Sequence, residues 1–475
     1  MRAITFTFIT LSVLAGSLLT SCIDDDFTTN PSHVLAFSTD TVAFDTVFTT
    51  IGSSTRSFRV YNPNKKSLNI SSIKLADAER SGFHINVDGM SGDQFTDVEI
   101  RGKDSIFVFV EANIDPTNQD NPIFIVDSIV FLTNGVQQDV KLTAYGQDVI
   151  IKRGEPFTTD TRLTADRPYL IYDSLVVAPG ATLQLDPGTR LHFHNRASLL
   201  VQGRLQAEGT QQAPIQIRGD RLDRLFADLP YDNLGGQWGG IHFYPESTGN
   251  VISHAYVRGM SSGIVLDSCA TEEMRLEIAN SRIRNSSGNL ITSNYSRLYC
   301  WNSELSDAAG AVLSLTGGIA DFTHCTIVNY YFYDVISSPI VTVNYCAAAD
   351  SIDGGLPLLR ARFNNSIICG KTSEVSGIDF MGSHVFFRSC LFNSMGTDDD
   401  NFINTVWGGM PLFKATGEEH YYYNYELGSE ESQAIGKGDP AFAVPPLDKD
   451  MYGNLRTDRV DIGAYQYVPQ AEPQE

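Results

Sequence analysis

Apolar and polar side chains alternate in short runs along most of this chain, most clearly between residues 171 and 217. The runs lie within residues 171–194 and 199–217, and this alternation is the pattern of β-strands with one buried face. Glycine stands at the corners between them, where the backbone needs dihedral angles that other residues resist. No segment with helical periodicity intervenes, so successive strands are expected to turn the same way and stack on one another.

A longer period extends this arrangement through the second half of the chain. Small side chains recur 22, 22, 21, 20 and 24 residues apart, at Ser281, Ser303, Cys325, Cys346, Ser366 and Cys390. Three residues before them stand Ile278, Cys300, Phe322, Val343, Phe363 and Phe387, and two residues after them Ile283, Leu305, Ile327, Ala348, Ile368 and Phe392. Asn280, Asn302 and Asn365 each precede a small residue, as expected at a tight bend where the side chain bonds the backbone. These columns predict a solenoid whose neighbouring coils bury each other.

The opening coils resemble the right-handed parallel β-helix of pectate-lyase-like proteins. Asp439-Pro440 and then residues 450–466, Asp-Met-Tyr-Gly-Asn-Leu-Arg-Thr-Asp-Arg-Val-Asp-Ile-Gly-Ala-Tyr-Gln, resemble the closing segment of secreted β-helix proteins of Bacteroidetes. We therefore predict a right-handed parallel β-helix with a C-terminal cap over residues 169–468, followed by a disordered tail at 469–475. A polar, turn-rich cap is expected to cover the open edge of the last coil.

Residues 34–150 carry a different strand pattern, with eight or nine short strands and turn residues between them. Asn134-Gly135 between two alternating runs is a strong hairpin signal. Residues 58–63, 68–70 and 142–148 resemble the Ig-like modules of the Hydin and SPD-2 type. The predicted fold class is thus all-β, with an N-terminal Ig-like β-sandwich, a linker at 151–168 and the parallel β-helix.

The amino terminus resembles a bacterial lipoprotein signal. A basic start and an apolar run are followed by Leu19-Thr20-Ser21-Cys22, which predicts a signal peptide at 1–21 and acylation of Cys22. The alternative is an uncleaved transmembrane helix, for which the apolar run is barely long enough. Residues 22–33 are then a tether, and its cluster Asp24-Asp25-Asp26 resembles the surface-export signal of Bacteroidetes lipoproteins; a merely solvated acidic run is the other interpretation. We expect a lipid anchor in the outer membrane and exposure at the cell surface.

The formal charge of −22 opposes long-range attraction to nucleic acid. A polyanionic glycan would need a local basic patch or bridging cations. Six cysteines follow Cys22, three of them in the small-residue column, and we favour buried thiols over disulfides because serine fills the same column elsewhere.

Two groups of residues are candidates for chemistry. Lyases on the resembled fold hold Ca²⁺ with aspartates and abstract a proton with lysine or arginine, and the densest acidic group here is Asp398, Asp399 and Asp400, beside Asn401. The alternative for that group is a solvated loop. His254, Tyr256 and Arg258, and likewise Tyr299 and Trp301, alternate with inward residues, so they could stack on sugar rings; they could equally be ordinary outward residues of amphipathic strands.

The aromatic run Tyr421–Tyr425 is either a glycan-contacting loop or a cap on the last coils. Neither paired carboxylates nor a metal cluster with a base can be assigned from spacing. We therefore expect a surface protein whose β-helix binds a polysaccharide or a partner protein. The alternative is a polysaccharide-degrading enzyme, a lyase or glycoside hydrolase, because fold alone does not decide function.

Overall fold

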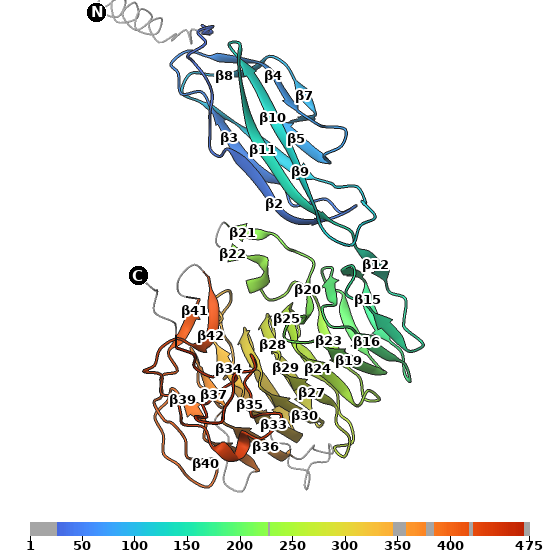
Figure 1. The fold of residues 1–475 in the computed structure, drawn as a ribbon, viewed down its shortest axis with the longest axis vertical. Helices are drawn as coiled ribbons and strands as arrows, with labels where there is room; N and C mark the ends of the chain where they lie inside the picture. The colour runs from blue at the N-terminus through green and yellow to red at the C-terminus, as the bar shows by residue number, and fades with distance from the viewer. Residues whose placement is uncertain (1–25, 227–228, 345–357, 377–383, 418–420, 470–475) are drawn as a thin grey trace, which may run out of the picture. The chain divides into compact units, whose positions relative to one another are not determined.

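The computed structural model describes residues 26–226, 229–344, 358–376, 384–417 and 421–469 (Figure 1). The chain divides after Gln147 into two compact units. Nearly all regular structure in both units is β-strand, which confirms the predicted all-β class, a sandwich followed by a parallel β-helix.

The first unit packs two mainly antiparallel sheets around one core. One has the order β1-β3-β9-β5-β6 and the other β2-β11-β10-β4-β7, with β8 beside β4. Their bounds are β1 Ala36–Phe37, β2 Thr41–Phe48, β3 Arg56–Tyr61, β4 Leu68–Leu75, β5 Phe83–Val87, β6 Met90–Gly92, β7 Gln94–Phe95, β8 Val98–Ile100, β9 Ser105–Ala112, β10 Ile123–Thr133 and β11 Val136–Gln147. The predicted hairpin is confirmed, since β10 and β11 pair in register from Thr133↔Val136 outward.

The second unit winds through three parallel sheets, here called sheets 1, 2 and 3. Sheet 1 contains β12 Ile150–Arg153, β14 Tyr169–Tyr172, β17 Arg190–Phe193, β20 Ile215–Gly219, β25 Ala255–Met260, β28 Arg282–Ser286, β31 Glu304–Ala308, β34 Thr326–Asn329, β37 Ile367–Gly370 and β39 Leu391–Phe392. Sheet 2 contains β13 Thr161–Leu163, β16 Thr182–Leu185, β19 Arg204–Glu208, β24 Asn250–Ser253, β27 Leu276–Ala279, β30 Arg297–Trp301, β33 Gly318–Thr323, β36 Leu358–Asn364, β38 Val385–Arg388 and β40 Phe402–Ile403. Sheet 3 contains β15 Ser174–Val177, β18 Ser198–Val201, β23 Gly240–Phe243, β26 Ile264–Leu266, β29 Ile291–Asn294, β32 Leu313–Thr316 and β35 Val341–Asn344.

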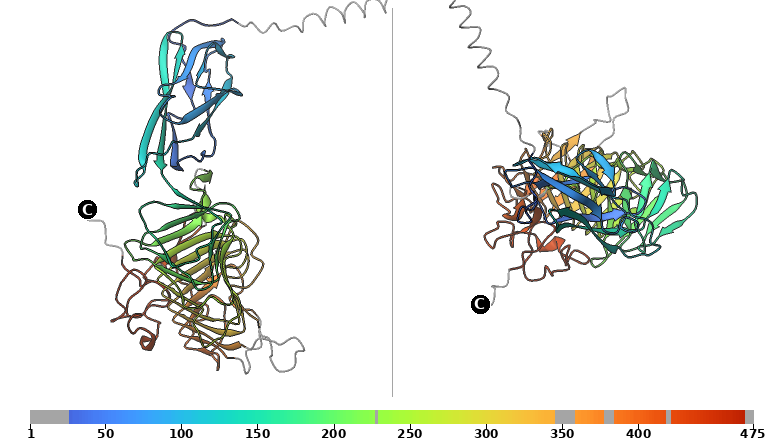
Figure 2. Two further views of the ribbon diagram at one scale, coloured as in Figure 1. Left: turned by 90° about the vertical axis from the view of Figure 1, so that its right-hand side faces the viewer. Right: turned by 90° about the horizontal axis from the view of Figure 1, so that it is seen from above.

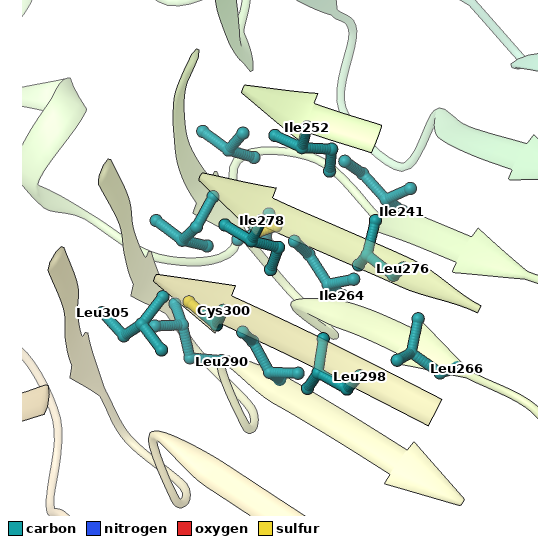
Figure 3. Packing of buried hydrophobic residues seen from close by; sticks show 14 of the residues in the cluster. Ile241, Ile252, Ile264, Leu266, Leu276, Ile278, Leu290, Leu298, Cys300 and Leu305 are labelled. Atoms are coloured by element: carbon teal, nitrogen blue, oxygen red, sulfur yellow. The ribbon is translucent and has the colours of Figure 1, made fainter. Parts of the chain in front are cut away.

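Stacked coils give the second unit its core (Figure 2, left). Inward side chains of one coil lie on those of the next, so that Ile278 pairs with Cys300 (Figure 3). In the same way Ile283 pairs with Leu305. These residues are fully buried. Each coil thus covers apolar surface that its neighbours would otherwise expose to water.

The predicted columns are confirmed in five of their six coils. Ser281, Ser303, Cys325, Ser366 and Cys390 are all buried, and the flanking apolar residues of these coils stand in register. The remaining coil, predicted from Val343 and Cys346, was assigned to the wrong sheet. Val343 pairs with Leu315 in sheet 3 rather than with Phe322 in sheet 2. The coil between Cys325 and Ser366 is about twice the usual length, so its sheet 3 strand imitates one more repeat. Cys346 and Ala348 lie outside the described residues.

The corner between sheets 2 and 1 explains the asparagine column. Asn280, Asn302 and Asn365 have φ between 46° and 47°, in the left-handed region that asparagine tolerates better than most residues. His254 (φ 47°) and His324 (φ 53°) occupy the same corner in other coils.

Two expectations, the linker at 151–168 and the position of the closing segment, need correction. Residues 151–168 are not merely a linker, because β12 and β13 pair with β14 and β16 as the first rungs of sheets 1 and 2. The prolines and glycine around them hid strands of only three or four residues. The closing segment, residues 439–466, runs along the side of the coils rather than over their open end. Its backbone bonds the side chains of Asn302 and Asn365.

Residues 220–236 interrupt the coils between β20 and β23 and form β21 Arg224–Phe226, β22 Leu229–Pro230 and the short 3₁₀ helix η2 Tyr231–Asn233. A hairpin of β41 Phe413–Thr416 and β42 Tyr423–Leu427 packs on the outer face of sheet 1 through Tyr425 and Leu427, against Val328 and Ile367. A second 3₁₀ helix, η3, spans Pro440–Phe442. No helix among the described residues is long and apolar enough to cross a membrane.

Candidate functional site

Arginines gather on the outer face of sheet 1. In β25 and β28 every second side chain turns inward, where Val257 and Ile283 are buried, and this places Tyr256, Arg258, Arg282 and Arg284 on the opposite face. Arg258 and Arg284 stand side by side in the strand register. Two like charges at neighbouring positions repel each other, so this arrangement costs free energy unless a counter-charge is supplied.

These arginines form the floor of a pocket of about 530 Å³, here called the arginine pocket. The insertion after β20 and the β41–β42 hairpin supply its walls. The lining residues are Gln216, Arg224, Pro230, Asp232, Asn233, Tyr256, Val257, Arg258, Arg282, Arg284, Tyr421, Tyr422 and Tyr423. The two walls are tied together, because Asn233 Nδ2 donates to the Tyr421 carbonyl oxygen at 2.7 Å.

Asp232 supplies part of the counter-charge. Its carboxylate lies 3.1 Å from Arg258 Nε and 2.5 Å from Arg218 Nη2. Burial favours the neutral acid, but Arg258 and Arg218 outweigh it and lower the pKa of Asp232. One carboxylate thereby fixes two guanidinium groups in place.

Arg282 is held in the floor of the pocket by its neighbours. Its guanidinium lies 5.4 Å from the ring centre of Tyr256 and 5.5 Å from that of Tyr452. Glu304 and Glu426 approach it to 3.7 and 3.8 Å. Since aromatic faces and carboxylates surround it, Arg282 serves chiefly to position these neighbours.

Arg284 differs from the other arginines in its contacts. Its guanidinium lies 5.8 Å from the ring centre of Tyr423, yet it forms no hydrogen bond or ion pair within the described parts of the chain. Burial alone would lower the pKa of Arg284, but the nearby carboxylates Glu304 and Asp307 raise it. It is therefore a permanent, half-buried cation whose hydrogen-bond donors have no acceptor among the described residues.

The aromatic run is divided between packing and the lining of the pocket. Tyr425 is buried in the apolar cluster between the hairpin and sheet 1, whereas Tyr421, Tyr422 and Tyr423 line the arginine pocket. Burial raises the pKa of Tyr423 above its ordinary value, so its hydroxyl remains protonated at neutral pH.

His254 and Tyr256 lie together, but beside a second and smaller pocket. This corner pocket has a volume of about 250 Å³ and is lined by Thr210, Gln211, Pro214, His254, Tyr256, Asn280, Met451 and Tyr452. Tyr256 lines both this pocket and the arginine pocket. Burial lowers the pKa of His254, which keeps its ring neutral at pH 7.

Tyr299 and Trp301 lie on a different sheet, so the four aromatic candidates do not form one strip. Both belong to β30 in sheet 2, whereas Tyr256 belongs to β25 in sheet 1. Trp301 Nε1 donates to Glu277 Oε1 at 2.9 Å. Tyr299 lines a third pocket of about 340 Å³, beside Asp321, which Arg360 and Arg362 both bind. The sequence did not reveal which sheet each strand joins.

The aspartates predicted for calcium serve local turns. Asp398 accepts hydrogen bonds from Thr405 N and Trp407 Nε1, and Asp399 accepts from Asn401 N and Phe402 N. Across the described residues, no group of three or more His, Cys, Asp or Glu is placed to hold a metal ion. The five described cysteines, 269, 300, 325, 369 and 390, are free thiols.

Sequence reasoning identified Tyr256, Arg258 and the tyrosine run but missed Arg282, Arg284 and Asp232. The alternation Arg282-Ile283-Arg284 next to the column residue Ser281 was a visible signal, because it places both arginines outward. Asp232 gave no such signal, because an irregular insertion carries it over the face of sheet 1.

No family model matches the chain, and no curated protein matches it. Three solved structures are similar to part of it. A family 123 glycoside hydrolase from Clostridium perfringens matches at 8% identity over 24% of this chain and 25% of that chain, with a TM-score of 0.17. The periplasmic chaperone SfaE matches at 17% identity over 24% and 57%, and a PapD-like domain of human CEP192 at 11% over 27% and 94%, each with a TM-score of 0.17. Similarities this low carry no argument about fold or function.

Proposed function

We propose that this protein is a cell-surface lipoprotein, anchored in the outer membrane through Cys22, whose β-helix binds an acidic glycan in the arginine pocket. The observation that carries the proposal is Arg284, a pocket-lining cation whose hydrogen-bond donors have no partner in the described chain. A carboxylate or sulfate of a sugar would satisfy these donors and offset the repulsion between Arg258 and Arg284.

The pocket also supplies what a sugar ring needs. Tyrosine rings offer flat faces for stacking, while hydroxyls and amides offer directional hydrogen bonds. A volume of about 530 Å³ falls within the usual range for small-ligand sites, about 300–1,000 Å³. The acidic chain as a whole would repel a polyanion, so binding depends on this local cluster.

Binding is favoured over glycan cleavage by the chemistry of the lining. Hydrolysis of a glycosidic bond commonly uses two carboxyl groups, whereas Asp232 is the one carboxylate among the described lining residues, and two arginines occupy it. Elimination needs a base, but the pKa values of Tyr423 and Arg284 are both raised, which makes them poor proton acceptors at neutral pH. A lyase remains the second candidate because arginine and tyrosine dominate the pocket.

The test is calorimetric titration of the purified protein, without its lipid, with uronic-acid oligosaccharides and neutral ones. Wild-type protein should bind the acidic series, and Arg284→Gln should weaken that binding about tenfold or more. Arg284→Lys should retain part of it, and Arg388→Gln, at an exposed position of sheet 2, should change nothing. Binding of neutral and acidic chains with equal affinity would exclude the proposal, and shortening of the chains would select the lyase.

A further inference from the structure

The corner pocket differs in character from its neighbour. Of its lining residues, none is Asp, Glu, Lys or Arg, and the pKa of His254 is lowered by burial. Its surface combines the rings of Tyr256 and Tyr452 with the amides of Gln211 and Asn280. A neutral, hydroxyl-rich ligand suits such a surface, because stacking and amide hydrogen bonds need no charge.

Asn280 is the residue that distinguishes this pocket. In later coils the equivalent asparagines bond the closing segment: Asn302 Nδ2 donates to Lys449 O, and Asn365 Nδ2 donates to Asp439 O. Asn280 has the same backbone conformation as these asparagines, but its side chain makes no hydrogen bond within the described residues. Its amide is therefore held at a fixed corner with its donors and acceptor available.

The two pockets share one wall. Tyr256 lines both, and the guanidinium of Arg282 lies 5.4 Å from its ring centre. Gln211 Nε2 donates to Tyr452 O at 2.6 Å, which fixes the far side of the corner pocket and leaves the amide oxygen of Gln211 available. Neighbouring units of one oligosaccharide could thus occupy both pockets on either side of Tyr256.

We propose that the corner pocket is a second sugar subsite, and that the ligand is an oligosaccharide in which a neutral sugar adjoins a uronic acid. This inference rests on the proposed function, since the uronic acid occupies the arginine pocket. The neutral sugar stacks on Tyr256 or Tyr452 and bonds the Asn280 amide. A second uronic acid is disfavoured there, because the described lining of the pocket contains no lysine or arginine to meet its carboxylate.

The experiment compares five ligands by calorimetry: a uronic acid monosaccharide, a diuronic acid, a disaccharide of uronic acid and hexose in each of its two linkage orders, and a neutral disaccharide. Wild-type protein should bind one of the mixed disaccharides about tenfold more tightly than the monosaccharide, the gain expected from about one or two hydrogen bonds. The diuronic acid should show no comparable gain.

The matched variants are Asn280→Gly and Asn195→Gly. Both positions have left-handed backbone, at φ 47° and 45°, which glycine adopts without strain, so the substitution removes only the side chain. Asn280→Gly should abolish most of the advantage of the mixed disaccharide, and the exposed Asn195→Gly should preserve it. An unchanged advantage in Asn280→Gly, or an equal gain with the diuronic acid, would overturn the second subsite while the proposed function stands. Failure of every uronic ligand to bind wild-type protein would overturn both.

Discussion

The hydroxyl of Tyr425 lies 2.7 and 2.9 Å from the two carboxylate oxygens of Asp307, a residue 118 positions earlier in the chain. Asp307 is buried under the hairpin, and its Oδ1 also accepts a hydrogen bond from Tyr330 N. This contact attaches the hairpin to sheet 1 next to Arg284, and so fixes one wall of the arginine pocket. A buried carboxyl in this position makes the attachment depend on pH.

Asp307→Asn should therefore change how stability varies with pH. Burial raises the pKa of Asp307 to about 6 from an ordinary value of 3.8. The folded state then holds more protons than the unfolded state between these values, so this group's contribution to stability is lost as pH rises from about 4 to above 6. Since one pKa unit corresponds to about 1.4 kcal/mol, wild type should lose about 3 kcal/mol relative to Asp307→Asn over that window.

Urea unfolding of both proteins from pH 4 to pH 8 measures this difference. Subtracting the unfolding free energy of the variant from that of wild type at each pH removes the contribution of all other titrating groups. A difference that is constant across the window would mean that Asp307 titrates normally in the fold. A difference that changes in the opposite direction would mean that Arg284 controls its charge more strongly than burial does.

Cys325→Asp should destabilise the second unit by several kcal/mol, because it places an unpaired carboxylate inside the coils. Cys325→Ser is the matched control, since Ser303 and Ser366 fill the same column position on either side, and it should cost about 1 kcal/mol or less. Denaturant unfolding distinguishes the two variants. Equal stability of Cys325→Asp and wild type would contradict the burial of this column.

The column also shows what the sequence determines and what it leaves open. Residues 22 apart, such as Ser281 and Ser303, could be aligned because each coil must bury the same kind of side chain at the same corner. Val343 was misassigned because a long coil carries a sheet 3 strand with the same apolar pattern. The arginine pocket depends on an insertion and a hairpin that cross the face of sheet 1. Nothing periodic specifies where such segments lie, so Asp232 could not be placed.

Cys22→Ala should release the protein from the outer membrane. The prediction rests on the lipoprotein signal in the sequence and concerns residues outside the described structure. Fractionation of cells and intact mass measurement are the assays. If the variant stayed in the outer-membrane fraction with the mass of the acylated protein, the signal would have been misinterpreted. Replacing Asp24, Asp25 and Asp26 by alanine should instead reduce surface labelling and leave acylation intact.

Asp232→Asn should tighten the binding of an acidic sugar while it weakens the fold. Asp232 pairs with Arg258 and Arg218, and Arg258 lines the pocket, so neutralisation of Asp232 leaves the Arg258 guanidinium available to the ligand and removes one repulsive charge from the pocket. The same change breaks two partly buried ion pairs, which should cost about 1–2 kcal/mol of stability after allowance for solvent screening. Calorimetric titration should therefore show a higher affinity for the acidic sugar, while thermal unfolding should show a lower unfolding temperature.

Asp223→Asn is the control for net charge, because it makes the same change of charge in the same insertion. Asp223 does not line the arginine pocket and pairs with Arg221 at 2.8 Å. Raising the ionic strength should reduce the gain of Asp232→Asn only modestly, because partly buried charges are screened less than exposed ones. Equal tightening in both variants would attribute the effect to the overall charge of −22 rather than to the pocket. Weaker binding in Asp232→Asn alone would mean that the carboxylate orients Arg258 for the ligand, and that geometry outweighs charge at this site.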